Sequence, residues 1–245
     1  MPPLFSRLYK QAPLLRTVIL AVLLPVTVVY LLLAAQPFVP LDVLLRDTNA
    51  EVYDPQGNVM FYRGALSNIG ILLWWTSTCI CAFAAFLFGT FKKPSWVGKA
   101  FLSYLAVFTG LLALDDLFML HEEVFPVRLG VSELALYAGY GVLAAGLVGF
   151  LPLLLELDFA LLGLALGFFA LSVAGDKGVL RVLFDLRGPT GLLFEDLAKM
   201  LGIVCWLIFS LRSAVQLLRT KTAAVPLYKS AETVQTSSDN PHRST

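Results

Sequence analysis

Long apolar runs, separated by short polar segments, dominate the pattern of this chain. A helix needs about 20 consecutive apolar residues to cross the ~30 Å hydrocarbon layer, because every backbone N–H and C=O must be paired inside lipid. Six runs meet this requirement. The pattern therefore predicts an all-α integral membrane protein, a bundle of six transmembrane helices at Arg16–Ala35, Leu66–Thr90, Lys99–Leu120, Leu134–Leu155, Phe159–Gly175 and Leu192–Leu211.

The segments outside these runs differ in character. In Gln36–Ala65, turn residues separate two short β-prone stretches, a pattern typical of a small hairpin outside the membrane. Residues 220–245 are rich in Ser and Thr, so we expect a disordered tail after a membrane domain at 1–219. Small residues recur every four positions in two of the runs, which predicts close helix packing at Gly141, Ala145 and Gly149 and at Gly163 and Gly167.

Basic residues set the expected orientation, because Lys and Arg are enriched in cytoplasmic loops. With six spans, both termini are expected in the cytoplasm. The first run is longer than the core of a secretory signal, which favours a membrane span there. The basic residues on the predicted cytoplasmic side are Arg7, Lys10, Arg16, Lys92, Lys93, Lys99, Arg212, Arg219, Lys221 and Lys229.

Composition supports the membrane interpretation and narrows the partners. The chain is 58% hydrophobic and 14% charged, whereas a soluble domain has about 25% charged residues. The net charge of +1 gives no excess of positive charge to attract nucleic acid. The apolar composition makes the lipid bilayer the expected partner, with a membrane-protein partner or a homo-oligomer as further possibilities. The three cysteines lie in apolar runs and support neither disulfides nor a zinc site of paired cysteines.

A charged cluster interrupts the end of the third predicted span. Asp115 and Glu122 share one stripe of a regular helix, and Asp116 lies on the neighbouring stripe. Charged groups at this depth usually face a polar cavity inside a bundle. His121 points more than about 100° away from Asp115 on a regular helix, unless the helix unwinds before Pro126.

Two later spans place acidic groups at the same level. Glu195 and Asp196 begin the sixth span, where Glu195 and Lys199 form a favourable i,i+4 ion pair. Gly202, on the same stripe, would let another helix approach. Asp176 ends the fifth span. The candidate ligand set is therefore Asp115, Asp116, His121, Glu122, Asp176, Glu195 and Asp196, with Lys199 as an ion-pair partner.

Carboxylates with one imidazole suit divalent cations such as Mn²⁺, Zn²⁺, Fe²⁺ or Ca²⁺, and the same groups can pass protons. The residues do not choose between these cations, or between a metal, a proton and internal pairing. A haem with two histidine ligands is excluded, because the other histidine, His242, lies in the tail. A Ser-His-Asp hydrolase is disfavoured, because neither Ser132 nor Ser172 has a nucleophile-elbow context.

The segments Leu114-Asp115-Asp116 and His121-Glu122, with the later Glu195-Asp196 pair followed by Gly202, resemble a pattern of uncharacterised bacterial multi-pass membrane proteins. In that pattern a glutamate is usual where Asp116 stands, and an acid is frequent at the position of Lys199. The resemblance covers the third to sixth spans. It implies a bacterial inner-membrane location and a site at these residues, and it names no reaction.

Three functions fit these observations. The first is a membrane protein whose extracytoplasmic carboxylate and histidine cavity binds a cation or a proton, for transport or metal handling. The second is a metal-dependent membrane hydrolase that acts on a lipid-like substrate. The third is a non-catalytic membrane subunit or assembly factor, in which the charges anchor a partner.

Overall fold

The computed structural model describes residues 4–45, 62–90, 96–179, 182 and 188–222. The described part is almost entirely helical and contains no strand, which confirms the all-α prediction. The helical elements in chain order are α1 (Leu4–Val18), η1 (Ile19–Leu23), α2 (Leu24–Ala35), α3 (Leu41–Leu45), α4 (Ala65–Thr90), α5 (Trp96–Phe118), η2 (Leu120–Arg128), α6 (Glu133–Gly146), η3 (Leu147–Phe150), α7 (Leu151–Leu154), α8 (Phe159–Asp176) and α10 (Gly188–Thr222).

Helices long and apolar enough to cross a membrane occur at all six predicted positions, so the six-span bundle is confirmed. The first and last extend furthest beyond their predicted limits, because polar and basic residues continue the helix past the apolar run. The observed candidate spans are Phe5–Ala35, Ala65–Thr90, Trp96–Phe118, Glu133–Leu154, Phe159–Asp176 and Thr190–Arg219.

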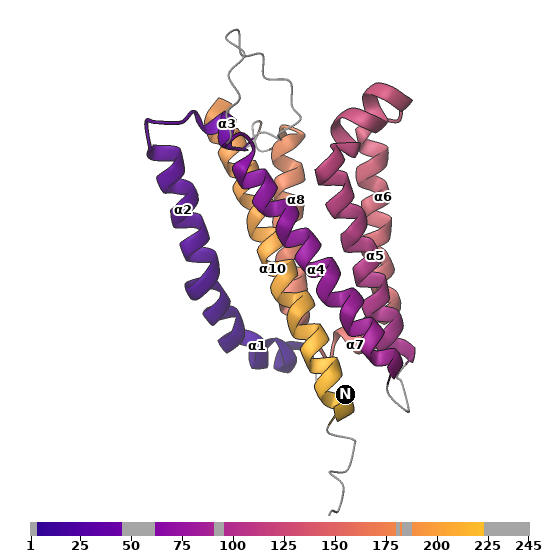
Figure 1. The fold of residues 1–245 in the computed structure, drawn as a ribbon. Coiled ribbons are helices and arrows are strands. Elements are labelled where there is room, and N and C mark those ends of the chain that lie inside the picture. The colour runs from indigo at the N-terminus through magenta and orange to yellow at the C-terminus, as the bar shows by residue number, and fades with distance from the viewer. Residues whose placement is uncertain (1–3, 46–61, 91–95, 180–181, 183–187, 223–245) are drawn as a thin grey trace, which may run out of the picture.

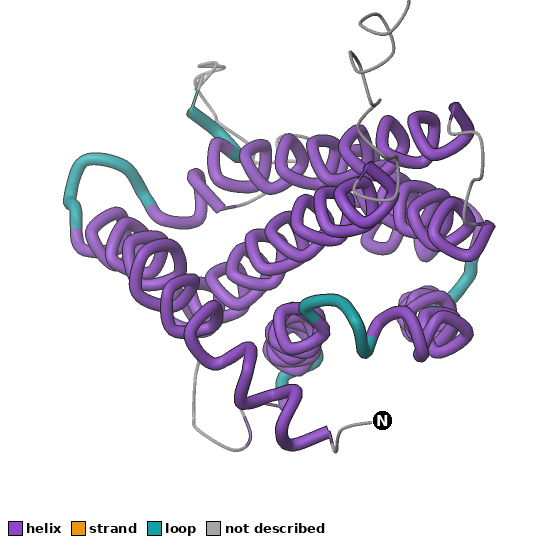
Figure 2. The backbone as a smooth tube through the Cα atoms, turned by 90° about the horizontal axis from the view of Figure 1, so that it is seen from below, coloured by secondary structure: helices purple, strands orange, loops and turns teal. Residues whose placement is uncertain are grey.

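Helix α10 lies at the centre of the bundle and is the most buried of the candidate spans. It packs against α8 on one side and α4 on another, and α4 in turn packs against α5 (Figures 1 and 2). Large aromatic side chains fill the contact: Trp206 and Phe209 of α10 are fully buried, as is Phe101 of α5. The mostly exposed apolar surface of α6 faces outward, as expected of helices in contact with lipid.

The first span bends where α1 meets α2. Helix α1 runs across the end of the bundle, whereas α2 runs along it, and the π-helical turn η1 joins the two (Figure 1). Two side chains hold α1 against the turn between α7 and α8. The Arg7 guanidinium donates to the Leu155 carbonyl at 2.6 Å, and the Gln11 amide donates to the Leu157 carbonyl at 2.9 Å.

The structure confirms one of the close helix contacts predicted from glycine positions and contradicts the others. Gly202 confirms its prediction: a Cβ there would lie 2.5 Å from a ring carbon of Phe169, so α8 approaches α10 closely at this level. The predicted close packing at Gly141, Gly149, Gly163 and Gly167 is wrong within the described chain, because no described atom lies within 4 Å of a Cβ built at any of them. The spacing alone did not identify a partner surface.

Two predictions fall on segments without a description. The hairpin proposed within Gln36–Ala65 lies mostly at residues 46–61, which are outside the described residues. The predicted tail from residue 220 also lies outside them, apart from the last residues of α10, which remain helical to Thr222.

The end of α5 is broken by one residue in a left-handed conformation. Met119 has φ of 51°, and the chain continues after it as the π-helical segment η2. This conformation is uncommon for a residue with a side chain, since Cβ then crowds the following carbonyl. The break redirects the chain, so His121 need not follow the helical stripe of α5.

We expect Met119→Gly to be more stable than Met119→Ala by about 1 kcal/mol. Both variants lose the methionine atoms beyond Cβ, but only glycine adopts positive φ freely. At an ordinary helix position alanine would be the more stable of the two. Thermal unfolding of the two purified variants in detergent measures the difference. A more stable alanine variant would contradict the left-handed break.

Candidate functional site

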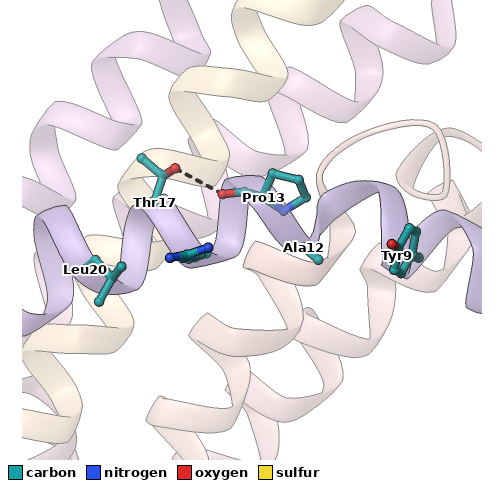
Figure 3. A pocket seen from close by; sticks show the side chains of 6 residues that line it. Tyr9, Ala12, Pro13, Thr17 and Leu20 are labelled. Atoms are coloured by element: carbon teal, nitrogen blue, oxygen red, sulfur yellow. Dashed lines mark hydrogen bonds between the residues drawn. The ribbon is translucent and has the colours of Figure 1, made fainter.

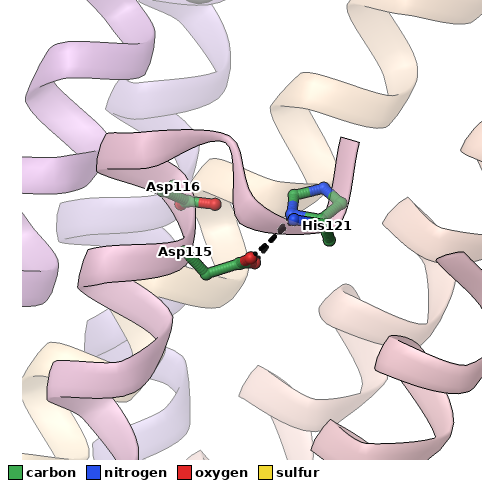
Figure 4. A group of neighbouring side chains, drawn as sticks. All are labelled: Asp115, Asp116 and His121. Atoms are coloured by element: carbon green, nitrogen blue, oxygen red, sulfur yellow. Dashed lines mark hydrogen bonds and ion pairs between the residues drawn. The ribbon is translucent and has the colours of Figure 1, made fainter. Parts of the chain in front are cut away.

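The carboxylate of Asp115 and the imidazole of His121 form the centre of the site. The Asp115 side chain is buried near the end of α5, and its Oδ2 lies 2.7 Å from His121 Nδ1. Its other oxygen, Oδ1, accepts the backbone N–H of His121 at 2.9 Å. Figure 4 shows the chain turning back after α5 so that the ring meets the carboxylate. The unwinding at Met119 therefore creates the contact that a regular helix would forbid.

The neighbouring carboxylate, Asp116, is also buried and has partners on two other helices. Trp74 of α4 donates its indole N–H to Oδ2 at 3.0 Å. Lys199 of α10 places its ammonium 3.0 Å from Oδ1. The sequence predicts Glu195, on the same helix, as the partner of Lys199. The contact of Lys199 with Asp116 is an ion pair between two helices. Asp116 thus links α4, α5 and α10 at one level.

Asp115, Asp116 and His121 can each offer a ligand atom to one metal ion. All three residues are buried, and the three ligand atoms lie within 4.8 Å of one another (Figure 4). Ligand atoms around a common ion at about 2.0–2.3 Å are separated by distances of this order. The geometry supports a small cation between the side chains.

A narrow pocket lies beside Asp116, between α2, α4, α5 and α10. It is lined by Tyr30, Asp116, Asp196 and Lys199, among others. Tyr30 donates its hydroxyl to Asp196 at 3.0 Å, so Asp196 faces this pocket. The cavity has a volume of about 10 Å³, roughly enough for one water molecule or small ion.

A second polar group covers the outer side of the site. Lys177 follows α8 and lies 2.6 Å from Glu133 Oε2 and 2.8 Å from Asp176 Oδ2. The Tyr137 hydroxyl lies 3.2 Å from both carboxylates, and the Tyr137 ring lies 5.5 Å from the imidazole of His121. This group joins α6 to α8 above the buried carboxylates.

The other predicted ligands lie around this centre. Glu122 Oε1 is 3.3 Å from His121 Nε2, and its side chain is 47% exposed, so it connects the histidine with the surface. Asp176 takes part in the outer group with Lys177. Glu195 packs against α8, where a Cβ at Gly175 would lie 3.2 Å from its own Cβ. The structure brings Asp115, Asp116 and His121 together and arranges Glu122, Asp176, Glu195 and Asp196 about them.

Contacts of His121 and Glu122 shift the ionisation of both side chains. Burial by itself lowers the pKa of His121, but the hydrogen bonds to Asp115 and Glu122 outweigh it and raise the pKa to about 10. The hydrogen bond to His121 lowers the pKa of Glu122 despite partial burial. Without a metal, His121 is therefore protonated at pH 7, and its single positive charge lies between the carboxylates of Asp115 and Glu122.

Sequence reasoning missed several side chains that complete the site. Trp74 and Tyr30 lie within apolar runs, where an aromatic residue usually means packing. Tyr137 and Lys177 were also missed. One usable signal exists, because indole and phenol groups seek a hydrogen-bond partner when buried in lipid-facing bundles. Which acidic side chain each of them reaches depends on the rotation of the helices about their axes, and the sequence does not show this rotation.

Comparison with known proteins gives a family and no activity. Neither a curated protein nor a solved structure matches this chain significantly. The model of one family, described as a domain of unknown function (DUF8692), matches residues 17–213, which include the middle four spans, most of the first and last spans, and the whole site. With most of its length matched, the chain belongs to the DUF8692 family.

Proposed function

We propose that this protein binds a divalent cation at Asp115, Asp116 and His121, for transport or metal handling. The observation that carries the proposal is the convergence of these three buried residues, whose ligand atoms lie within 4.8 Å of one another. Two carboxylates and one imidazole are a ligand set suited to Mn²⁺, Fe²⁺ or Zn²⁺. Three protein ligands leave further coordination positions to water or to Glu122.

Charge compensation explains how such a site can exist empty and still accept a cation. Asp115 is paired with His121, and Asp116 is paired with Lys199. A divalent ion replaces these partners: the imidazole loses its proton and becomes a ligand, and the Lys199 ammonium moves away from Oδ1. Binding is then an exchange of positive charge inside the bundle, and it avoids unpaired buried carboxylates in either state.

The dimensions of the pocket favour a small cargo over a lipid-like substrate. The space beside Asp116 holds about one water molecule, whereas pockets for organic ligands are about 300–1,000 Å³. This pocket, whose lining includes Asp116 but not Asp115 or His121, therefore supports the cation hypothesis only at the Asp116 side of the site. By the positive-inside rule, the site faces away from the cytoplasm, and both termini lie inside.

Purified protein should retain about one equivalent of a divalent metal after detergent extraction, as measured by elemental analysis. Asp116→Asn and His121→Ala each remove a ligand, so we expect affinity for Mn²⁺ or Zn²⁺ to fall by about 100-fold or more. Isothermal titration in detergent measures the change.

Asp158→Asn is the matched control for this loss. Asp158 is also a buried, ion-paired carboxylate, bound to Arg212 at 2.6 Å, but it begins α8 at the opposite end of the bundle. It should retain metal at wild-type affinity even if it unfolds more readily. Folded Asp116→Asn and His121→Ala with unchanged metal affinity would refute the site and favour an assembly role.

Cation affinity should rise with pH. The raised pKa of His121, about 10, means that its proton must leave when the ring binds a metal below that pH. Affinity is therefore expected to increase by about tenfold per pH unit for each proton released. Competition with a fluorescent chelator across neutral to mildly alkaline pH measures this slope. In His121→Gln the slope should decrease by about one proton, and an unchanged slope would contradict the role of the histidine.

Transport can be separated from metal handling in reconstituted vesicles. Proteoliposomes that contain a metal-sensitive dye should admit Mn²⁺ faster than empty vesicles if the site carries its cation across. Asp116→Asn should reduce the influx to the background rate, and Asp158→Asn should preserve it. Metal binding without influx would assign the protein to metal handling.

A further inference from the structure

The outward face of α1 lies where the first span leaves the membrane. The residues after α1, from Ile19 to Ala35, form about 26 Å of helix, close to the ~30 Å thickness of the hydrocarbon layer. Arg16 is therefore at the level of the lipid phosphates, at the end of the bundle opposite the cation site. Helix α1, whose last turn contains Arg16, runs across this end of the bundle (Figure 1).

The two faces of α1 have different partners. Arg7 and Gln11 bind carbonyls of the α7–α8 turn, which orients α1 on the bundle. Tyr9, Pro13 and Arg16 lie on the other face, since residues three, four or seven positions apart share one side of a helix. All three are exposed, and Tyr9 is exposed by 78%.

This outward face forms a pocket of about 580 Å³ (Figure 3). Its lining combines one cation, Arg16, with the phenol of Tyr9 and the apolar side chains of Pro13 and Leu20. Arg16 has no hydrogen bond or ion pair with any described residue. Its guanidinium is therefore an available donor at phosphate level, beside an apolar surface that continues into the membrane.

The backbone offers an acceptor at the same place. Pro13 has no N–H, so it cannot donate to the Tyr9 carbonyl one turn earlier. The Thr17 hydroxyl is already used, because it donates to the Pro13 carbonyl at 3.0 Å. The pocket thus presents two groups to a ligand. The Arg16 guanidinium can donate to an anionic oxygen, and the backbone carbonyl of Tyr9 can accept from a hydroxyl.

We infer that this pocket binds one anionic phospholipid, with the phosphate on Arg16, the polar headgroup beside Tyr9 and the first part of an acyl chain along Leu20. Charge complementarity carries the inference, together with the position of an unpaired guanidinium at the lipid boundary. Guanidinium groups bind phosphate oxygens through paired N–H donors. The apolar lining distinguishes the ligand from free phosphate, which has nothing to place on Leu20. The site is separate from the proposed cation site and does not depend on it.

Native mass spectrometry of the full-length protein in detergent tests the inference. The probes are phosphatidylglycerol, phosphatidylcholine and inorganic phosphate, and the variants are Arg16→Gln and Lys10→Gln. Lys10 is the matched control, because it is an exposed cation on the same helix but does not line the pocket. We expect one phosphatidylglycerol to bind wild-type protein in preference to phosphatidylcholine, and Arg16→Gln to weaken this binding about fivefold.

Lys10→Gln should change the affinity less than about twofold, and millimolar inorganic phosphate should leave the lipid in place. Equal losses in Arg16→Gln and Lys10→Gln would overturn the pocket in favour of diffuse surface charge. Displacement by inorganic phosphate would identify a free anion site and overturn the lipid assignment. Equal binding of phosphatidylcholine, or an unaffected Arg16→Gln, would also overturn it.

Discussion

The burial of two adjacent carboxylates at the end of α5 is the constraint on which this structure depends. Asp115 and Asp116 are 4% and 9% exposed, inside a bundle whose other described core residues are mostly apolar. An unpaired buried charge is strongly unfavourable, and removal of one partner from a buried pair costs about 3–5 kcal/mol. Each carboxylate therefore needs its own cation. The positions of His121 and Lys199 follow from this need.

The two carboxylates are compensated in different ways, and this explains the shape of the region. Lys199 reaches Asp116 across the α5–α10 contact without any change of backbone. His121 follows Asp115 by six residues and would face away from it on a regular helix. The left-handed Met119 removes this obstacle, and two hydrogen bonds from His121 to Asp115 offset the local strain. The helix break and the buried pair therefore stabilise each other.

The sequence predicted the features that depend on hydropathy and spacing along one helix. All six spans were predicted, since apolar length alone determines them. The sequence predicted a contact between Asp115 and His121 only if the helix unwinds between them. Met119, where it does unwind, is not a helix-breaking residue, so the sequence contains no signal for the break. The partners Trp74 and Tyr30 were not predicted, because they depend on the rotation of α4 and α2 about their axes. A glycine pattern likewise permits close packing without selecting a neighbour.

The arrangement of charges also indicates how a cation would reach the centre. Glu122 is the most exposed of the groups that contact His121, and it approaches Nε2, whereas Asp115 holds Nδ1. In the proposed function, an ion arriving from the solvent would meet Glu122 first and compete with it for the imidazole. Lys177 lies nearby and pairs with both Glu133 and Asp176, so its single positive charge offsets part of the negative charge of these two acids. In the proposed function, the half-exposed Glu122 would therefore be the first carboxylate that a cation meets, ahead of the buried Asp115 and Asp116.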